Sequence, residues 1–258
     1  MIKKLIFASA LLLFLCACEG TTPTPKTVAT NTIPTTVSET PTSISVVSTP
    51  LPVTTQSLEN EAAIQFRDDF KEELEPGWEW VNEKNALWSL SITPDFLTIN
   101  VIGGYINLGN ISNLLLRPAP EGNFTIETYL KFTPQHSNQF AGLILYESDK
   151  TYILAGEEYC PPVFGCVGRG IYMDVYQAGD LQIPRNPTLY DEDAVYLRLV
   201  RSEDTVNLFV SSNGNIWYRA NTHKTTMNIE KIGLVTGQSL QSDPVPAQFD
   251  YFLVSPNN

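Results

Sequence analysis

The stretch Phe124-Thr125-Ile126-Glu127-Thr128-Tyr129-Leu130-Lys131-Phe132 decides the fold class of this chain. The residues at its even positions are apolar apart from one threonine, and those between them are polar or aromatic. Because successive side chains of a β-strand point to opposite faces, this alternation predicts a strand with one buried face. Residues 195–200 and 206–211 alternate in the same way, and only residues 58–65 could hold a short helix.

Turn signals separate further short strands along the chain. Residues 206–211 lead into Asn213-Gly214, which predicts a type I′ hairpin and a return strand at 216–220. Short strands that each bury one face predict an all-β fold, a two-sheet antiparallel sandwich. The other strand candidates are residues 88–92, 96–101, 141–147, 152–157, 170–177, 232–237 and 249–254.

The first part of the chain has a different composition. Residues 18–57 are rich in Thr, Ser and Pro and contain no aromatic residue, so they cannot bury enough apolar area to offset their ordering entropy. They predict a disordered stalk. Before it, Lys3 and Lys4 precede an apolar run at 5–15 that is short for a membrane span. The folded domain is expected at 58–258, which is long enough for one substantial core.

The step from Ala17 to Cys18 resembles the lipobox of bacterial lipoprotein signals. The resemblance implies a signal peptide at 1–17, cleavage before Cys18, and acylation of its sulfur and new amino group. Cys16 departs from the usual pattern, in which Ala or Ser is commoner. A plain secretory signal and an uncleaved anchor helix are the alternatives. The lipoprotein interpretation places the protein outside the cytoplasm, on a bacterial cell envelope, with its membrane contact made through the lipid.

The lipobox resemblance also implies a role for each of the four cysteines. Cys16 leaves with the signal and Cys18 carries the lipid, while Cys160 and Cys166 remain in a compartment that permits disulfides. A bridge between them would fix one small loop and contribute about 2 kcal/mol by the chain-entropy model. A metal site is the alternative, but neither of the two histidines lies at ligand spacing from a cysteine.

The net charge excludes one class of partner. The chain carries 16 basic and 28 acidic residues, a net charge of −12. Loss of residues 1–17 would remove two lysines and no acid, which leaves −14. An acidic protein is repelled by phosphate backbones, so we expect no nucleic-acid partner.

A series of segments occurs in a fixed order along the chain: Phe66-Arg67-Asp68-Asp69-Phe70, 74–80, 88–90, 96–99, 116–120, 124–128, 139–146, 196–201, 211–217 and 249–252. In that order the segments resemble the concanavalin A-like domain at the C-terminus of family 43 β-xylosidases, and its stand-alone relatives of unknown function. The resemblance covers about residues 64–256 and implies a jelly-roll sandwich, in agreement with the alternation. In the β-xylosidases a separate propeller domain carries the catalytic carboxylates, and this chain has no room for one.

One predicted strand combines aromatic and acidic side chains on a single face. Tyr172, Asp174 and Tyr176 share a face, opposite three apolar residues that would look inward. Proteins hold sugars with flat aromatic rings beside amide and carboxylate groups. Together with Trp80 and Tyr146, these residues form the predicted ligand-binding set for an extracellular glycan. The alternative is that the aromatics fill the core or cover a strand surface, as we expect of Trp88 and Trp217.

Three aspartates suggest a structural calcium ion. Asp68 and Asp69 near the start of the domain and Asp250 near its end would be adjacent if the terminal strands pair, and carboxylates suit this hard cation. The alternative is that they cap turns or accept backbone N–H bonds. No other cofactor is expected.

Enzyme motifs are missing from the sequence. The Glu-x-Asp-x-x-Glu strand motif of sandwich-fold glucanases, the Gly-x-Ser-x-Gly elbow and the phosphate-binding loops do not occur. Lone strand carboxylates such as Glu127 and Glu147 are typical of solvated faces, so no catalytic residue is assigned. The sequence predicts a monomeric, non-catalytic glycan-binding module. A surface protein-interaction or structural module is the alternative, followed by a glycoside hydrolase.

Overall fold

The computed structural model describes residues 64–163, 165–241 and 243–257. The predicted signal peptide, the predicted acylation site at Cys18, the predicted stalk and most of the expected helix at 58–65 lie outside these residues. Residues 57–258 form one compact unit. Within the described part of the chain, no helix is long and apolar enough to cross a membrane.

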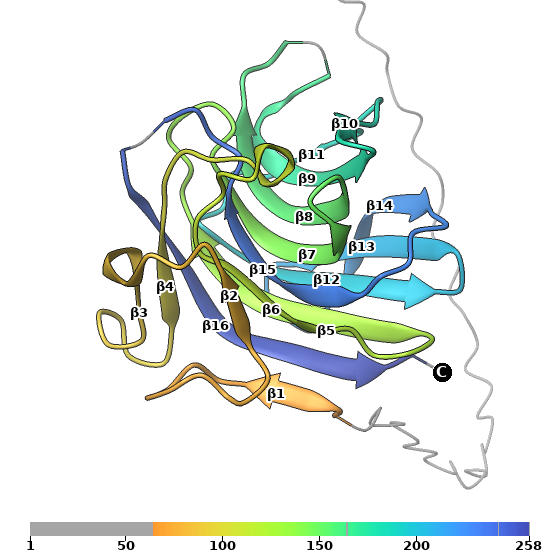
Figure 1. Ribbon diagram of the computed structural model, residues 1–258. Helices are drawn as coiled ribbons and strands as arrows, with labels where there is room; N and C mark the ends of the chain where they lie inside the picture. The colour runs from red at the N-terminus through yellow and green to blue at the C-terminus, as the bar shows by residue number, and fades with distance from the viewer. Residues whose placement is uncertain (1–63, 164, 242, 258) are drawn as a thin grey trace, which may run out of the picture. The chain divides into compact units, whose positions relative to one another are not determined.

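Two antiparallel sheets pack face to face as a β-sandwich (Figure 1). The predicted fold class, an all-β concanavalin A-like sandwich, is confirmed. In spatial order, sheet A contains β14 (Tyr218–Lys224), β13 (Thr205–Ser211), β12 (Ala194–Ser202), β6 (Phe124–Phe132), β16 (Val245–Pro256), β4 (Leu97–Val101) and β3 (Trp88–Ser89), and β1 (Phe66–Asp68) also pairs with β16. Sheet B contains β10 (Asp180–Leu181), β9 (Gly168–Gln177), β8 (Thr151–Cys160), β7 (Phe140–Ser148), β15 (Lys231–Gly237), β5 (Leu114–Pro118) and β2 (Glu79–Val81), and β11 (Thr188–Leu189) also pairs with β9.

The core between the sheets follows the alternation in the sequence. Val195, Leu197 and Leu199 of β12 are fully buried, while the residues between them are partly exposed. On β9, Ile171 and Met173 belong to the same core, as predicted from their spacing. On β12 and β9 the period of two therefore identifies the face that looks inward.

The predicted hairpin forms, because β13 and β14 pair as antiparallel neighbours, but its predicted type I′ turn at Asn213-Gly214 is wrong. Residues 212–217 form a longer loop between β13 and β14, and only Gly214 has the positive φ that a type I′ turn requires at both central positions. The side chain of Asn213 accepts the backbone N–H groups of Asn215 and Ile216 at 2.9 and 3.0 Å. This local hydrogen bonding gives the backbone an alternative to the tight turn.

The outer face of sheet B is covered over much of its width. Residues 102–113, which contain the short 3-10 helix η2 (Ile106–Leu108), lie across it and form a second hydrophobic cluster with the sheet. Asn107 Nδ2 donates to the carbonyl of Gly179 at 3.1 Å, so this segment reaches the turn after β9. The cluster consists of Ile106, Ile111, Leu114, Leu116, Phe140, Ile144, Tyr152, Leu154 and Val235.

Candidate ligand-binding site

Three tyrosines form a row across the outer face of sheet B. Tyr146 of β7 lies opposite Tyr152 of β8, which lies opposite Tyr176 of β9. The rings of Tyr152 and Tyr176 stack with 4.5 Å between centroids. Tyr152 is fully buried, whereas Tyr146 and Tyr176 are half-buried. The structure thus brings two predicted ligand-binding residues, Tyr146 and Tyr176, into one row and adds Tyr152, which was not in the predicted set.

Trp80 lies apart from the tyrosine row. It pairs with Leu115 of the core between the sheets, and its ring centroid is 4.9 Å from that of Trp88. Trp80 therefore faces the inner side of sheet B and does not extend the row. Trp88 packs against the core, as expected. The expectation that Trp217 belongs to the core is wrong, because its ring is half-buried beneath the Arg198 guanidinium at 3.7 Å, outside the core cluster.

Tyr172 supports a loop rather than offering its ring to solvent. Its side chain has no exposed surface. Its hydroxyl accepts the Val167 N–H and donates to the Gly168 carbonyl, both at 3.0 Å. These residues follow the predicted Cys160–Cys166 disulfide, which is formed, with 5.4 Å between the Cα atoms. Tyr172 and the bridge together fix the shape of this loop.

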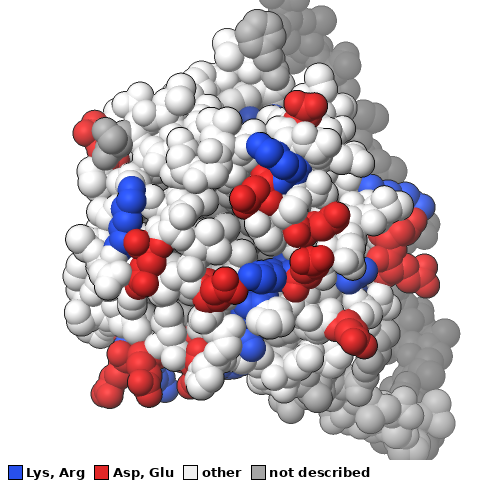
Figure 2. Space-filling model, in the orientation of Figure 1, with Lys and Arg blue, Asp and Glu red and all other residues white. Residues whose placement is uncertain are grey.

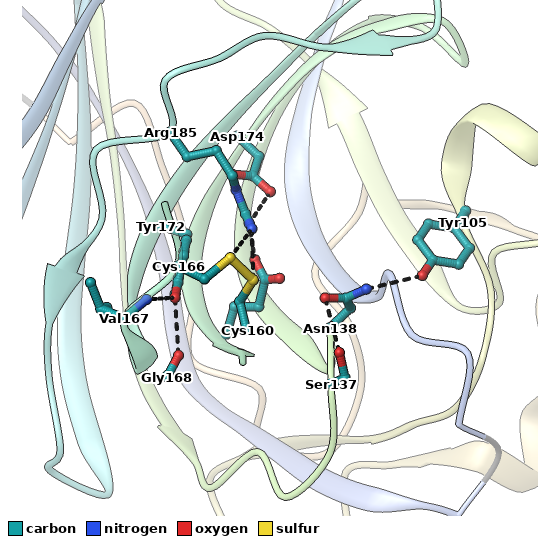
Figure 3. Close-up of a disulfide and its surroundings, with 11 residues drawn as sticks. Tyr105, Ser137, Asn138, Cys160, Cys166, Val167, Gly168, Tyr172, Asp174 and Arg185 are labelled. Carbon is teal, nitrogen blue, oxygen red and sulfur yellow. Dashed lines mark hydrogen bonds and ion pairs between the residues drawn. A yellow bond between two sulfur atoms is a disulfide. The ribbon is translucent and has the colours of Figure 1, made fainter. Parts of the chain in front are cut away.

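Arg185 closes a buried ionic cluster beside the disulfide (Figure 3). Its Nε and Nη2 atoms donate to the two carboxylate oxygens of Asp174 at 2.7 and 2.6 Å, and Nη2 also donates to Glu158. Its Nη1 atom lies 3.2 and 3.3 Å from the two disulfide sulfurs, and its guanidinium covers the ring of Tyr172 at 4.5 Å. The predicted residue Asp174 is therefore occupied by a cation from the chain itself.

The cluster holds two carboxyl groups against one guanidinium. Burial, assisted by the negative charge of Asp174, raises the pKa of Glu158 to about 8, and Arg185 opposes this shift. Burial also raises the pKa of Asp174, again opposed by Arg185. Because two buried like charges repel each other, the pair favours a state in which one proton is retained and a single negative charge balances Arg185.

A cleft of about 760 Å³ opens beside this cluster, at the edge where β9 and β10 of sheet B face β14 of sheet A. We call it the edge cleft. The segment that carries Arg185 forms one wall and is held to β14 by Asn221 Nδ2, which donates to the carbonyls of Arg185 and Asn186 at 3.3 Å. Its described lining comprises Glu147, Thr151, Met173, Val175, Tyr176, Gln177, Ala178, Gln182, Ile183, Pro184, Arg185, Asn186, Asp204, Asn221, Thr222, His223, Lys224, Thr225, Thr226 and Met227.

The three predicted calcium ligands already have other partners or lie apart from a ligand set. The Asp68 carboxylate accepts the backbone N–H groups of Phe70 and Glu75 at 2.8 and 2.9 Å, and Trp78 Nε1–H at 2.8 Å. Asp69 pairs with Arg67 at 2.7 Å, and Asp250 lies on β16. Among the described residues, no group of three or more His, Cys, Asp or Glu side chains could hold a metal ion. The calcium site stays a prediction.

Sequence reasoning did not select Glu158 or Arg185. Glu158 shares the outer-face parity of Tyr152 on β8, so the alternation contained a signal for it. Arg185 lies on the irregular segment between β10 and β11, where no periodicity indicates which way a side chain points.

The fold and the cleft define a single concanavalin A-like sandwich with a small-ligand-sized groove at its edge. Residues 67–255 match the family described as the β-xylosidase C-terminal concanavalin A-like domain. The match spans most of the chain, and the protein belongs to this family. No curated protein matches the chain.

Solved structures show the same fold in larger and in stand-alone proteins. A family 43 glycoside hydrolase protein from Bacillus licheniformis is 18% identical with a TM-score of 0.67, over 74% of this chain and 39% of that one. A xylan β-1,4-xylosidase from Bacillus halodurans is 20% identical with a TM-score of 0.60, over 73% and 38%. A functionally unknown protein from Saccharomyces cerevisiae is 11% identical with a TM-score of 0.56, over 70% and 97%. The chain therefore spans less than half of the hydrolases that it resembles.

Proposed function

We propose that this protein is a cell-envelope lipoprotein whose β-sandwich binds an extracellular glycan without cleaving it. The observation that carries the proposal is the edge cleft, whose lining combines the half-buried Tyr176 with several amide and hydroxyl side chains. Its volume of about 760 Å³ falls within the usual range for small-ligand sites. A sugar needs this combination, because its ring has an apolar face and its rim carries hydroxyl groups.

The buried carboxyl groups favour binding over hydrolysis. A glycosidase needs two carboxyl groups that face one sugar. Glu158 and Asp174 are instead held together by Arg185, and their side chains are only 4% and 6% exposed. Glu157 pairs with Arg169, also inside the protein. A carboxyl group held in this way has no access to a substrate proton.

The proposed location rests on the sequence before the domain. Lys3, Lys4 and the apolar run that ends before Cys18 support export and acylation. The low-complexity residues 18–57 would then act as a tether that gives the domain reach from the membrane surface. A structural calcium ion at Asp68, Asp69 and Asp250 stays a prediction, and because none of these residues lines the edge cleft, the proposed glycan binding does not depend on it.

The test is a binding screen of the compact unit Ser57–Asn258 against neutral and acidic polysaccharides by affinity electrophoresis. Xylan belongs in the screen because a structurally similar protein is a xylan β-1,4-xylosidase. Tyr176→Ala should weaken retardation by about two- to tenfold, the value of one aromatic contact. Tyr218→Ala is the matched control, because Tyr218 is 66% exposed and does not line the cleft. Release of reducing ends would indicate a hydrolase, and no retardation on any glycan would favour a protein partner.

A further inference from the structure

The hydrogen-bonding groups of the edge cleft are largely uncharged. Gln177 and Gln182 come from the sheet B side, and Asn221 and Thr222 from β14. Amide and hydroxyl groups both donate and accept, which matches the hydroxyl groups of a sugar. A carboxylate ligand would instead require a free cation, most effectively the fork of an arginine.

Arg185 lines the cleft, but its guanidinium is not available to a ligand. Arg185 lines the cleft with its segment, but its guanidinium donates to Asp174 and Glu158 and is only 10% exposed. Figure 3 shows the guanidinium turned toward the disulfide and Asp174. All of its nitrogen atoms have partners there. It therefore presents no donor to an anionic ligand.

The remaining basic groups of the lining add little positive charge. Lys224 Nζ lies 3.7 Å from Asp204, and both side chains are well exposed. Burial lowers the pKa of His223, which keeps its ring neutral at physiological pH. Glu147, on the opposite wall, accepts the backbone N–H of Asn228 at 2.9 Å. The charged groups of the lining thus leave the cleft neutral or slightly negative.

The negative net charge of the domain also disfavours anionic ligands. The chain has a net charge of −12, and Figure 2 shows acidic and basic side chains interspersed over one face of the domain. A polyanionic glycan would be repelled before it reached the cleft, most strongly at low salt. A neutral glycan would approach the cleft without this electrostatic repulsion.

We propose that the edge cleft selects neutral glycans over those that carry uronic acids, and that the burial of the Arg185 guanidinium against Asp174 and Glu158 sets this selectivity. The inference rests on the proposed glycan-binding function and names the class of ligand. The specificity-determining feature is an arginine kept out of the site by two carboxyl groups of the same chain.

The experiment is calorimetric titration of the Ser57–Asn258 unit with xylohexaose, cellohexaose and hexagalacturonic acid. It is run at about 20 mM and about 300 mM salt, between which the screening length falls from roughly 20 Å to roughly 6 Å. We expect saturable binding of a neutral hexasaccharide, with a Kd that changes less than about twofold between the two salts because no ion pair forms. Hexagalacturonic acid should not saturate the site in either salt.

A variant that adds one positive charge to the cleft tests the proposed selectivity directly. Gln182 is exposed in the lining, and Gln182→Lys places one free cation at the cleft. It should create hexagalacturonic acid binding at low salt that weakens about two- to fivefold at high salt, as for an exposed ion pair. Gln135→Lys is the control, because Gln135 is exposed on the loop between β6 and β7 and does not line the cleft.

The outcomes separate the two proposals. A wild-type preference for hexagalacturonic acid would overturn the neutral class while keeping the glycan-binding function. Equal gains from Gln182→Lys and Gln135→Lys would show that net charge, and not the cleft, governs selectivity, which also overturns the inference. Binding of no hexasaccharide would overturn the proposed function itself.

Discussion

Replacing Arg185 by alanine removes the one cation that two buried carboxyl groups share. The Arg185, Glu158 and Asp174 side chains are 10%, 4% and 6% exposed, so water cannot take over the lost hydrogen bonds. Removing one partner from a buried ion pair costs about 3–5 kcal/mol, because the remaining charge is left uncompensated. We expect a loss of this size in the free energy of unfolding for Arg185→Ala at pH 8.5.

The loss of unfolding free energy caused by Arg185→Ala should be smaller at lower pH. The sign of this pH dependence follows from the direction of the pKa shifts. Burial raises the pKa of Glu158 to about 8 and raises that of Asp174, so the folded state holds more protons than the unfolded state. Such groups stabilise the fold fully below the unfolded pKa, and this contribution disappears as pH rises through the folded pKa. Without Arg185 both carboxyl groups can be neutral at pH 5.5, which leaves about 1–3 kcal/mol for the missing hydrogen bonds.

Urea unfolding of the Ser57–Asn258 unit at the two pH values measures both losses. Arg219→Ala is the control, because Arg219 is exposed on β14, and it should change stability by no more than about 0.5 kcal/mol. A loss for Arg185→Ala below about 1 kcal/mol at pH 8.5 would contradict the ionic cluster as we describe it. An equal loss at both pH values would refute the shared-proton argument.

Three further predictions concern other parts of the chain. Reduction of the Cys160–Cys166 bridge should cost about 2 kcal/mol and lower Tm by roughly 4–8 °C, and an unchanged Tm with and without reductant would contradict this. Because Asp68 already accepts three N–H bonds, a chelator should leave Tm unchanged, and a clear fall in its presence would instead reveal a calcium ion. Cys18→Ser should move the full-length protein from the membrane to the soluble fraction in cell fractionation, and continued membrane association would argue against acylation at this residue.

The sequence predicted the sandwich because strand alternation is a local property. On β9 the period of two correctly separated Ile171 and Met173, which face the core, from Tyr172 and Asp174 on the other side. The same reasoning recovered most long strands to within a few residues. It failed at Asn213, where side-chain hydrogen bonds to the backbone favour a longer loop over a tight turn.

The cover on the outer face of sheet B could not be predicted in this way. Tyr172 and Asp174 were expected to face solvent, because alternation describes one strand and not what packs over it. Residues 102–113 and the segment that carries Arg185 come from elsewhere in the chain and bury part of this face. Their positions depend on tertiary contacts such as the bond from Asn107 to Gly179. The predicted ligand surface was thereby reduced to the half-buried Tyr146 and Tyr176, and the edge cleft beside Tyr176 became the candidate site.

The most direct test of the central claim is an NMR titration of the isotope-labelled Ser57–Asn258 unit with neutral xylo- and gluco-oligosaccharides, followed amide by amide. The claim predicts saturable shifts that gather at Tyr176, Gln177 and Gln182 on one wall of the edge cleft and at Asn221 and Thr222 on the other. No shift with any neutral oligosaccharide, or shifts confined to residues that do not line the edge cleft, would contradict it.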